Sequence, residues 1–103
     1  MISFATDIMI PDTTCMDIAE IIGVLANPHR IRVLCVLLDG ERHVAGIADA
    51  IGLSQAHTSS HLRVLYDRGL VVRRKEWRNV FYSLRDERVA RLLEAAQQAA
   101  TSG

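Results

Sequence analysis

The sequence holds little cysteine and no long apolar run. With two cysteines among 103 residues, it offers no basis for a disulfide framework. No apolar stretch reaches the roughly 18–20 residues that cross a bilayer, and the first residues lack the basic start of a signal peptide. We therefore expect a cytoplasmic protein without a membrane partner, whose thiols are reduced at rest.

Catalytic signatures are absent as well. The chain has no glycine-rich phosphate loop, no Cys–His or Ser–His–Asp arrangement set out by a motif, and no pair of catalytic carboxylates. Half of the residues are hydrophobic, which argues against a disordered chain, and the length suits one small domain. We expect a binding domain rather than an enzyme.

The formal net charge of zero conceals an asymmetry along the chain. Residues 1–53 carry seven acidic and three basic side chains, whereas residues 54–91 carry nine basic and four acidic ones. A basic segment is the electrostatic footprint of a surface that binds a polyanion. A nucleic-acid interface is therefore predicted in the second half of the chain.

The stretch from Ser54 to Gly69 predicts a helix with an unusual exposed face. Ser54 suits the N-cap, and Gly69 suits the position just past the end. Leu62 and Leu65 form its apolar stripe, with Thr58 at the margin. The exposed face of the first turns has hydrogen-bonding side chains and no carboxylate, which suits base edges and phosphates. The predicted DNA-contacting residues of this helix are Gln55, His57, Thr58, Ser59 and Arg63.

A shorter helix at 44–51 comes before it and ends at Gly52, so the pair is typical of a helix-turn-helix. A hairpin follows, with strands at 70–75 and 80–84 and a connecting loop at 76–79. Its basic side chains gather toward the tip, where DNA phosphates or a minor groove come within reach. These side chains are Arg73, Arg74, Lys75 and Arg78. The competing interpretation is an edge whose charges prevent aggregation.

Further helices are predicted at 17–26, 28–38 and 86–100, with residues 1–16 as a loose N-terminal arm and 17–103 as a single domain. The first and last helices have apolar stripes that so small a domain cannot easily cover. Pairing of these helices between two copies covers both stripes. The predicted fold is mainly α with a small β-hairpin: a winged helix-turn-helix of about five helices plus a two-stranded wing, assembled as a homodimer.

Several segments, in matching order and spacing, resemble the ArsR/SmtB family of bacterial winged-helix regulators. They are LANPHRIRVL at 25–34, IADAIGLSQ at 47–55, SHLRVL at 60–65, GLVVRR at 69–74 and VFYSL at 80–84. The resemblance implies a homodimer that represses transcription from inverted repeats in double-stranded DNA and releases them when an effector binds. The alternatives are an activator, an effector-independent regulator, or a winged-helix module that docks a partner protein.

Two metal sites of that family are not matched here. Many metal-sensing members carry a Cys-Val-Cys where this chain has His43, Val44 and Ala45. Others bind zinc, nickel or cobalt through an Asp-x-His, but here Arg88 stands in the place of the histidine after Asp86. A guanidinium does not coordinate a metal, because it has no acceptor. No metal is therefore predicted at the usual family sites.

Other effector chemistry stays open. His57 and His61 have the i, i+4 spacing of a zinc pair but no evident third ligand. His29 and His43, with acids of the N-terminal half, would suit nickel, cobalt or zinc at a non-standard site, and having no cofactor is the alternative.

The two thiols allow two interpretations. Cys35 is expected to be a buried small hydrophobe or, alternatively, a redox-active thiol with Cys15 as its only partner. The candidate effector residues are Cys15, Cys35 and His43.

Overall fold

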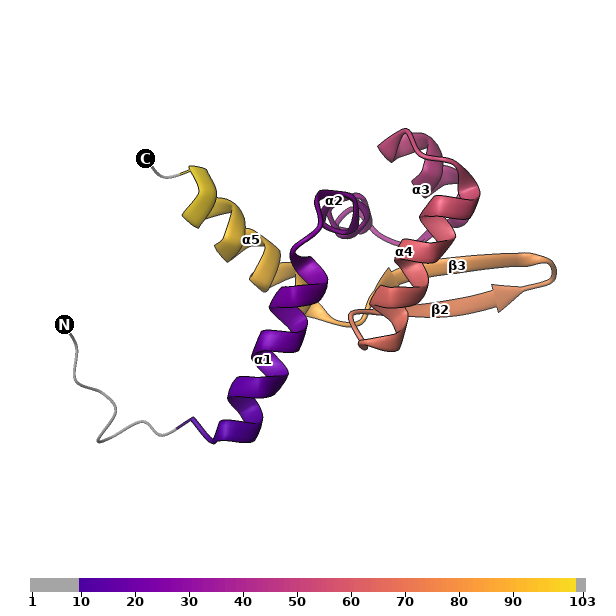
Figure 1. The fold of residues 1–103 in the computed structure, drawn as a ribbon. Helices are drawn as coiled ribbons and strands as arrows, with labels where there is room; N and C mark the ends of the chain where they lie inside the picture. Colours follow the sequence, from indigo (N-terminus) through magenta and orange to yellow (C-terminus); the bar gives the residue numbers. More distant parts are fainter. Residues whose placement is uncertain (1–9, 102–103) are drawn as a thin grey trace.

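A computed structural model of the chain describes residues 10–101. Within that range the elements are α1 (Asp12–Leu25), α2 (Pro28–Leu37), β1 (Arg42–His43), α3 (Val44–Ile51), α4 (Gln55–Asp67), β2 (Val71–Glu76), β3 (Asn79–Leu84) and α5 (Glu87–Thr101). Figure 1 shows α2, α3 and α4 gathered at the base of the β2–β3 hairpin, with α1 and α5 extending on the opposite side. The molecule is elongated, 52 × 32 × 21 Å. The predicted winged helix-turn-helix architecture is confirmed.

Side-chain caps set the helix starts as the sequence predicted. Asn27 Oδ1 accepts hydrogen bonds from the backbone N–H groups of His29 and Arg30, at 2.9 and 3.2 Å, and Pro28 occupies the first helical position of α2. At α5, Asp86 Oδ1 accepts from the Arg88 N–H at 2.9 Å. These caps satisfy N–H groups that have no partner within the helix.

The start of the first helix was predicted wrongly. α1 begins at Asp12, with Pro11 as its N-cap residue, so residues 12–16 are helical and not part of a loose arm. A proline just before a helix is compatible with its first turn, which needs no N–H from that position. Residues 1–9 of the predicted arm lie outside the described residues.

The sheet has three antiparallel strands in the order β1-β3-β2, where the sequence predicted two. The additional strand, β1, is two residues long and pairs Arg42 with Tyr82 and His43 with Phe81. Two residues are too few to show the alternation of apolar and polar side chains that marks a strand, so only the pairing with β3 defines β1. In the hairpin, Glu76 pairs with Asn79, and the connection is a two-residue turn rather than the predicted four-residue loop.

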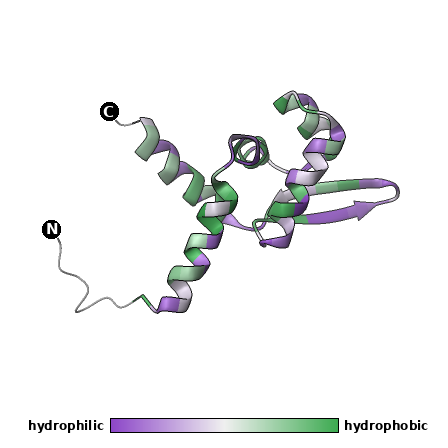
Figure 2. Cartoon of the chain, in the orientation of Figure 1, coloured by the Kyte–Doolittle hydropathy of each residue, from purple (hydrophilic) through white to green (hydrophobic). Residues whose placement is uncertain are grey.

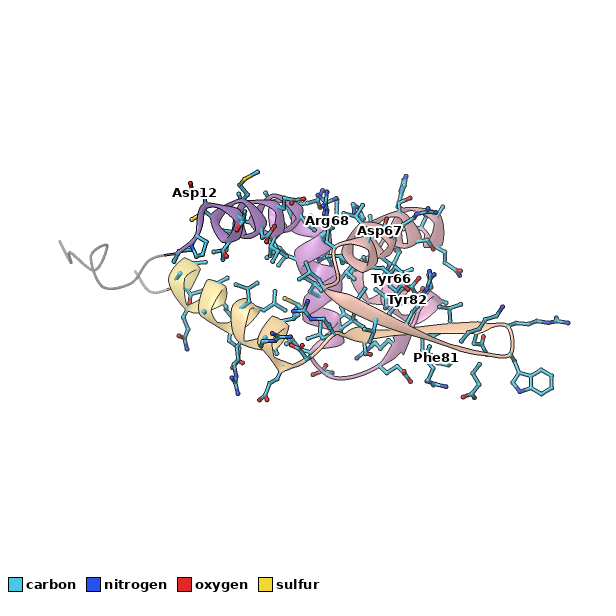
Figure 3. The ribbon with its side chains drawn as sticks, turned by 90° about the horizontal axis from the view of Figure 1, so that it is seen from below. Asp12, Tyr66, Asp67, Arg68, Phe81 and Tyr82 are labelled. Atoms are coloured by element: carbon cyan, nitrogen blue, oxygen red, sulfur yellow. The ribbon has the colours of Figure 1, made fainter. Side chains whose placement is uncertain are left out.

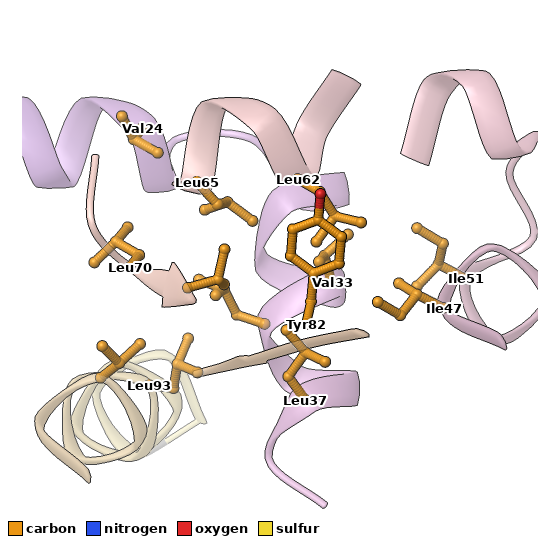
Figure 4. Close-up of a cluster of buried hydrophobic side chains, with 13 residues drawn as sticks. Val24, Val33, Leu37, Ile47, Ile51, Leu62, Leu65, Leu70, Tyr82 and Leu93 are labelled. Carbon is orange, nitrogen blue, oxygen red and sulfur yellow. The ribbon is translucent and has the colours of Figure 1, made fainter. Parts of the chain in front are cut away.

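One core joins all parts of this architecture (Figure 4). Its buried hydrophobic residues come from every helix, from β2 and β3, and from Leu70 just before β2: Val24, Val33, Leu34, Leu37, Ile47, Ile51, Leu62, Leu65, Leu70, Val71, Tyr82, Val89 and Leu93. The α3–α4 pair is therefore held against α2 and the hairpin base by apolar burial. The outer surface of α4 faces solvent.

A second apolar surface stays uncovered around α1, α2 and α5. Ile18 and Ile22 of α1 are 42% and 58% exposed, and Ile31, Leu38 and Leu92 are exposed as well. Figure 2 shows this apolar character along α1 and α5, away from the hairpin. No helix within residues 10–101 combines the length and the apolar character that a bilayer span requires.

Candidate nucleic-acid interface

The turn between α3 and α4 is built from a glycine and a small residue. Gly52 adopts φ 71°, the left-handed conformation that glycine tolerates without a steric penalty. The Ala48 carbonyl accepts hydrogen bonds from the N–H groups of both Gly52 (2.9 Å) and Leu53 (3.2 Å). Ala48 is buried, which lets the two helices approach closely. This turn fixes the direction in which α4 leaves α3.

The first turns of α4 present a polar face to solvent. Ser54 caps the helix, with its Oγ accepting from the His57 N–H at 3.1 Å. The side chains of Gln55, His57, Ser59 and Arg63 are exposed. The Arg63 side chain is 83% exposed, and its Nε lies 3.9 Å from Asp67 Oδ2. Such a loose, solvated pair leaves the guanidinium able to bind another anion.

Thr58 was assigned wrongly to this face. Its side chain is fully buried, and its Oγ1 donates to the Ser54 carbonyl at 2.8 Å. Thr58 lies four residues before Leu62 and seven before Leu65, so helical periodicity turns it toward the core. The sequence already indicated the burial of Thr58, because Thr58, Leu62 and Leu65 lie on one helical stripe.

The two faces of the wing, β2 and β3 with their turn, carry different chemistry. Side chains alternate along a strand, so Arg73 and Lys75 share the α4 side of β2 with the buried Val71. Figure 3 shows Tyr66 and Tyr82 between α4 and the sheet, with Phe81 on the other side. The Arg73 guanidinium lies over the Tyr66 ring, 4.1 Å from its centroid. The neighbouring Tyr82 hydroxyl, followed by Tyr66, raises the pKa of Arg73.

The Arg74 side chain lies on the face of β2 opposite to Arg73, and its guanidinium binds two carboxylates. Its Nη2 and Nε donate to the Glu41 carboxylate at 2.8 and 3.1 Å, and its Nη1 donates to Glu76 at 2.6 Å. The hydrogen bond to Glu41, then that to Glu76, raises the pKa of Arg74. These contacts fasten the wing to the segment before α3. The Arg74 guanidinium is therefore engaged within the protein, unlike the predicted phosphate contacts at Lys75 and Arg78.

The tip of the wing is basic and exposed. Lys75 and Arg78 are both exposed, and within residues 10–101 neither forms an ion pair. Arg78 and Asn79 line one shallow depression together with Gln55 and Ser59, so the tip and the N-terminal end of α4 border the same surface. The structure thus brings the predicted residues Gln55, Ser59 and Arg78 together.

A pair of histidines that the sequence pattern did not connect joins α2 to α4. The rings of His29 in α2 and His61 in α4 pack against each other, with centroids 5.6 Å apart and planes tilted by 35°. Burial, followed by the charges of Arg30, His29 and His57, lowers the pKa of His61 below its ordinary value. The pair comes from two helices, so no spacing in the sequence could reveal it.

The candidate effector residues lie on three different elements. Cys15 lies on α1 and Cys35 on α2, and both are exposed free thiols, so the prediction of a buried Cys35 is wrong. His43 packs against Phe81 with ring centroids 5.8 Å apart. Across residues 10–101, no three His, Cys, Asp or Glu side chains form a group that could hold a metal.

Cys35 instead lines an apolar groove of about 290 Å³ between α2 and α5. Leu38, Leu92 and Ala96 are among its other walls. At the start of α5, Asp86 is engaged by Arg88, whose Nη2 lies 2.7 Å from its Oδ2. The hydrogen bonds from Arg88 hold the pKa of Asp86 well below its usual range. Asp86 therefore serves as a cap and an ion-pair partner in this chain.

Comparison with known proteins matches this geometry to one family. Residues 27–72, from α2 to the start of the wing, match the bacterial regulatory protein, arsR family. The chain is 42% identical over 79 residues to the HTH-type transcriptional regulator NmtR of Mycobacterium tuberculosis, covering 77% of this chain and 66% of NmtR. It is 42% identical over 82 residues to a cadmium resistance transcriptional regulatory protein, the CadC homolog of Staphylococcus aureus, covering 79% and 68%.

Among solved structures, the chain resembles the homodimeric winged helix-turn-helix DNA-binding domain of Mb0332 from Mycobacterium bovis. The TM-score is 0.80 at 35% identity, covering 86% of this chain and 82% of that domain. The chain spans about two thirds of the length of the curated relatives it matches. Their names describe transcriptional regulators, in agreement with the expectation that the chain is not an enzyme. The match in sequence and fold shows that this chain belongs to the arsR family of bacterial regulatory proteins.

Proposed function

We propose that the protein is a homodimeric transcriptional repressor that binds an inverted-repeat operator in the cytoplasm. The observation that carries this proposal is the surface shared by α4 and the wing. Its exposed helical face has hydrogen-bonding groups and no carboxylate in the first two turns, and cations flank it. Such a surface matches base edges in the major groove and the phosphates on either side.

The residues divide into readers and positioning contacts. Gln55, His57 and Ser59 would face base edges, and a glutamine can bond adenine through two hydrogen bonds. Arg63, Arg73, Lys75 and Arg78 would bind phosphates, which fix the register of the helix without reading sequence. We expect Gln55→Ala to change sequence preference and Arg63→Ala to weaken all duplexes alike.

The homodimer is supported by the uncovered apolar surface of α1, α2 and α5. Ile22 at 58% exposed and Leu92 at 38% are unfavourable on a monomer surface, and a two-fold pairing of these helices would bury them. The Mb0332 domain is described as homodimeric. A two-fold dimer presents two copies of α4, which requires two half-sites related by inversion.

A salt titration tests the proposal. The purified protein is titrated with a duplex from its own promoter region and with a shuffled duplex, between about 50 and 200 mM salt. We expect tighter binding to the promoter duplex, with affinity falling steeply as salt rises, because neutralised phosphates release counterions. If neither duplex binds in a salt-dependent way, the DNA-binding function is wrong, and a protein-docking role becomes the better explanation.

We further propose that the operator is released by a metal or a thiol-reactive effector. The cadmium-related name of one relative favours a metal. In this chain, the exposed Cys35 in the groove between α2 and α5 favours thiol chemistry. An ion pair between Glu20 of α1 and Arg68 at the end of α4 would couple the helices around that groove to the reader.

Operator binding with and without zinc, nickel, cobalt, cadmium, peroxide and persulfide separates these effectors. We expect a thiol reagent to weaken binding by the wild type and to leave Cys35→Ser unaffected. The matched control is Cys15→Ser, because Cys15 is also exposed but does not line the groove. Release by a metal in the Cys35→Ser protein would contradict the thiol mechanism.

A further inference from the structure

The most unusual residue of the wing is at its turn. Trp77 is 90% exposed, the largest exposed fraction among the exposed large hydrophobic residues of the described chain. Aromatic rings of this size are normally buried, where they contribute much of the energy of a core or an interface. An indole left in water therefore indicates that something outside this chain covers it.

The backbone at Trp77 is strained as well. Its φ is 57°, and within residues 10–101 it is the one non-glycine residue with a positive φ. It is the first residue of a two-residue hairpin turn, and only this residue of the turn has a positive φ. Glycine is the usual residue there, because a Cβ is unfavourable in this conformation. At Gly40, Gly52 and Gly69, which also have positive φ, the chain uses glycine.

The surroundings of the indole indicate the kind of partner. Lys75 and Arg78 stand beside it without ion-pair partners among the described residues, and Arg74 neutralises the nearby Glu76 carboxylate. A partner that meets both an aromatic ring and two free cations is an anionic polymer with apolar surfaces between its charges. The wing and the α1–α5 end lie at opposite ends of the molecule, so helix pairing would not cover the turn (Figure 1).

We propose that Trp77 enters the minor groove of DNA beside the half-site that α4 reads, packing its indole against the sugars and the edge of a base step. This inference rests on the proposed function. Each six-residue strand of the wing is roughly 20 Å long, at about 3.3 Å per residue. Half a turn of B-DNA is about 17 Å, so a hairpin rooted beside a helix in the major groove brings its turn to the adjacent minor groove. Apolar side chains that enter a minor groove commonly wedge a base step.

The single tryptophan of the chain makes this contact directly observable. Its fluorescence is measured in the free protein and in the operator complex, with acrylamide as a quencher. We expect the free protein to be quenched as an exposed indole and the complex to be protected from acrylamide, with altered emission intensity. An indole equally accessible to acrylamide in both states would overturn the proposal.

Substitutions test whether the contact contributes to affinity. Trp77→Gly should weaken operator binding by about tenfold or more, since an aromatic ring stacked on a base contributes about this much in complexes with single-stranded nucleic acid. The slope of affinity against salt should stay unchanged, because indole is neutral. Trp77→Phe should retain most of the affinity. Glycine suits the turn, so we expect a raised melting temperature for Trp77→Gly, and a loss of affinity is then not caused by misfolding.

The outcomes separate this inference from the proposed function. Salt-dependent operator binding that is equally tight in the wild type and Trp77→Gly would overturn the role of Trp77 and leave the function standing. Absence of binding to any duplex by the wild type would overturn both.

Discussion

Among the residues of the described chain that adopt a positive φ, those in two turns beside the α4–wing surface differ in type. The turn between α3 and α4 uses Gly52 at φ 71°, whereas the wing uses Trp77 at φ 57°. Glycine reaches this conformation freely, but a side chain with a Cβ raises the free energy of the folded state. The first turn therefore agrees with local preference, and the second opposes it.

The difference separates residues that set the backbone conformation of the interface from residues whose side chains contact a partner. Gly52 has no atom within 4 Å of the position where a Cβ would lie, so it is required for its backbone and not for space. Trp77 has the opposite character, because its backbone is unfavourable and its side chain is exposed. Local strain that a sequence retains is commonly found at functional sites.

The largest expected effect in this comparison comes from Gly52→Ala. A Cβ in the left-handed region costs about 1–2 kcal/mol, so the free energy of unfolding should fall by about that amount. Urea unfolding followed by circular dichroism measures this change.

The matched control is Gly46→Ala inside α3. Gly46 also has open space around it but no positive φ, so alanine should stabilise the helix by about 0.5–1 kcal/mol. If both substitutions destabilise the protein equally, the backbone explanation for Gly52 fails.

Most elements were predictable because their signals are local. The caps at Asn27 and Ser54 and the glycine after α3 are read directly from residue type. The order of a helix pair followed by a hairpin then indicated the winged fold. Contacts between distant segments were not predictable in this way, as the pairing of β1 and the packing of His29 against His61 show.

The site was predicted less well than the fold, for two physical reasons. Thr58 is polar but lies on the core stripe, so residue type suggested an exposed position and periodicity a buried one. Arg73 and Arg74 look equivalent in a basic run, yet alternation along β2 places them on opposite faces. Only the structure shows that Glu41 lies beside the second of them.

Thr58→Val sharpens the assignment of faces on α4. It removes the hydrogen bond from Oγ1 to the Ser54 carbonyl, which still accepts the Thr58 N–H at 3.0 Å. The free energy of unfolding should fall by about 1 kcal/mol, with sequence preference unchanged. Ser59→Ala on the exposed face should show the reverse: unchanged unfolding and weaker operator binding. A change in operator preference for Thr58→Val would place Thr58 back at the interface.

The salt dependence of operator affinity distinguishes the phosphate contact predicted for Arg78 from the internal ion pairs of Arg74. Arg78→Ala should reduce the slope of log affinity against log salt by about 0.9 for each phosphate that the arginine neutralises, or roughly 1.8 in a dimer. Arg74→Ala should leave the slope unchanged and slightly lower the melting temperature, because its guanidinium binds Glu41 and Glu76. Titrations of both variants at several salt concentrations measure the slopes. Equal slopes for Arg78→Ala and the wild type would remove Arg78 from the phosphate contacts.

The smallest expected effect concerns acid pH and the helix pair that supports the reader. Burial, with the charges of Arg30, His29 and His57, lowers the pKa of His61 from its ordinary value of 6.5. The unfolded chain then binds the proton more readily than the folded one, so stability is lost as pH falls below about 6.5. Melting temperatures of the free protein from pH 7.5 to 5 should decline less in His61→Gln than in the wild type. His57→Gln is the control: its ring is exposed, so most of the decline should remain. An identical decline in His61→Gln and the wild type would show that another group carries the acid sensitivity.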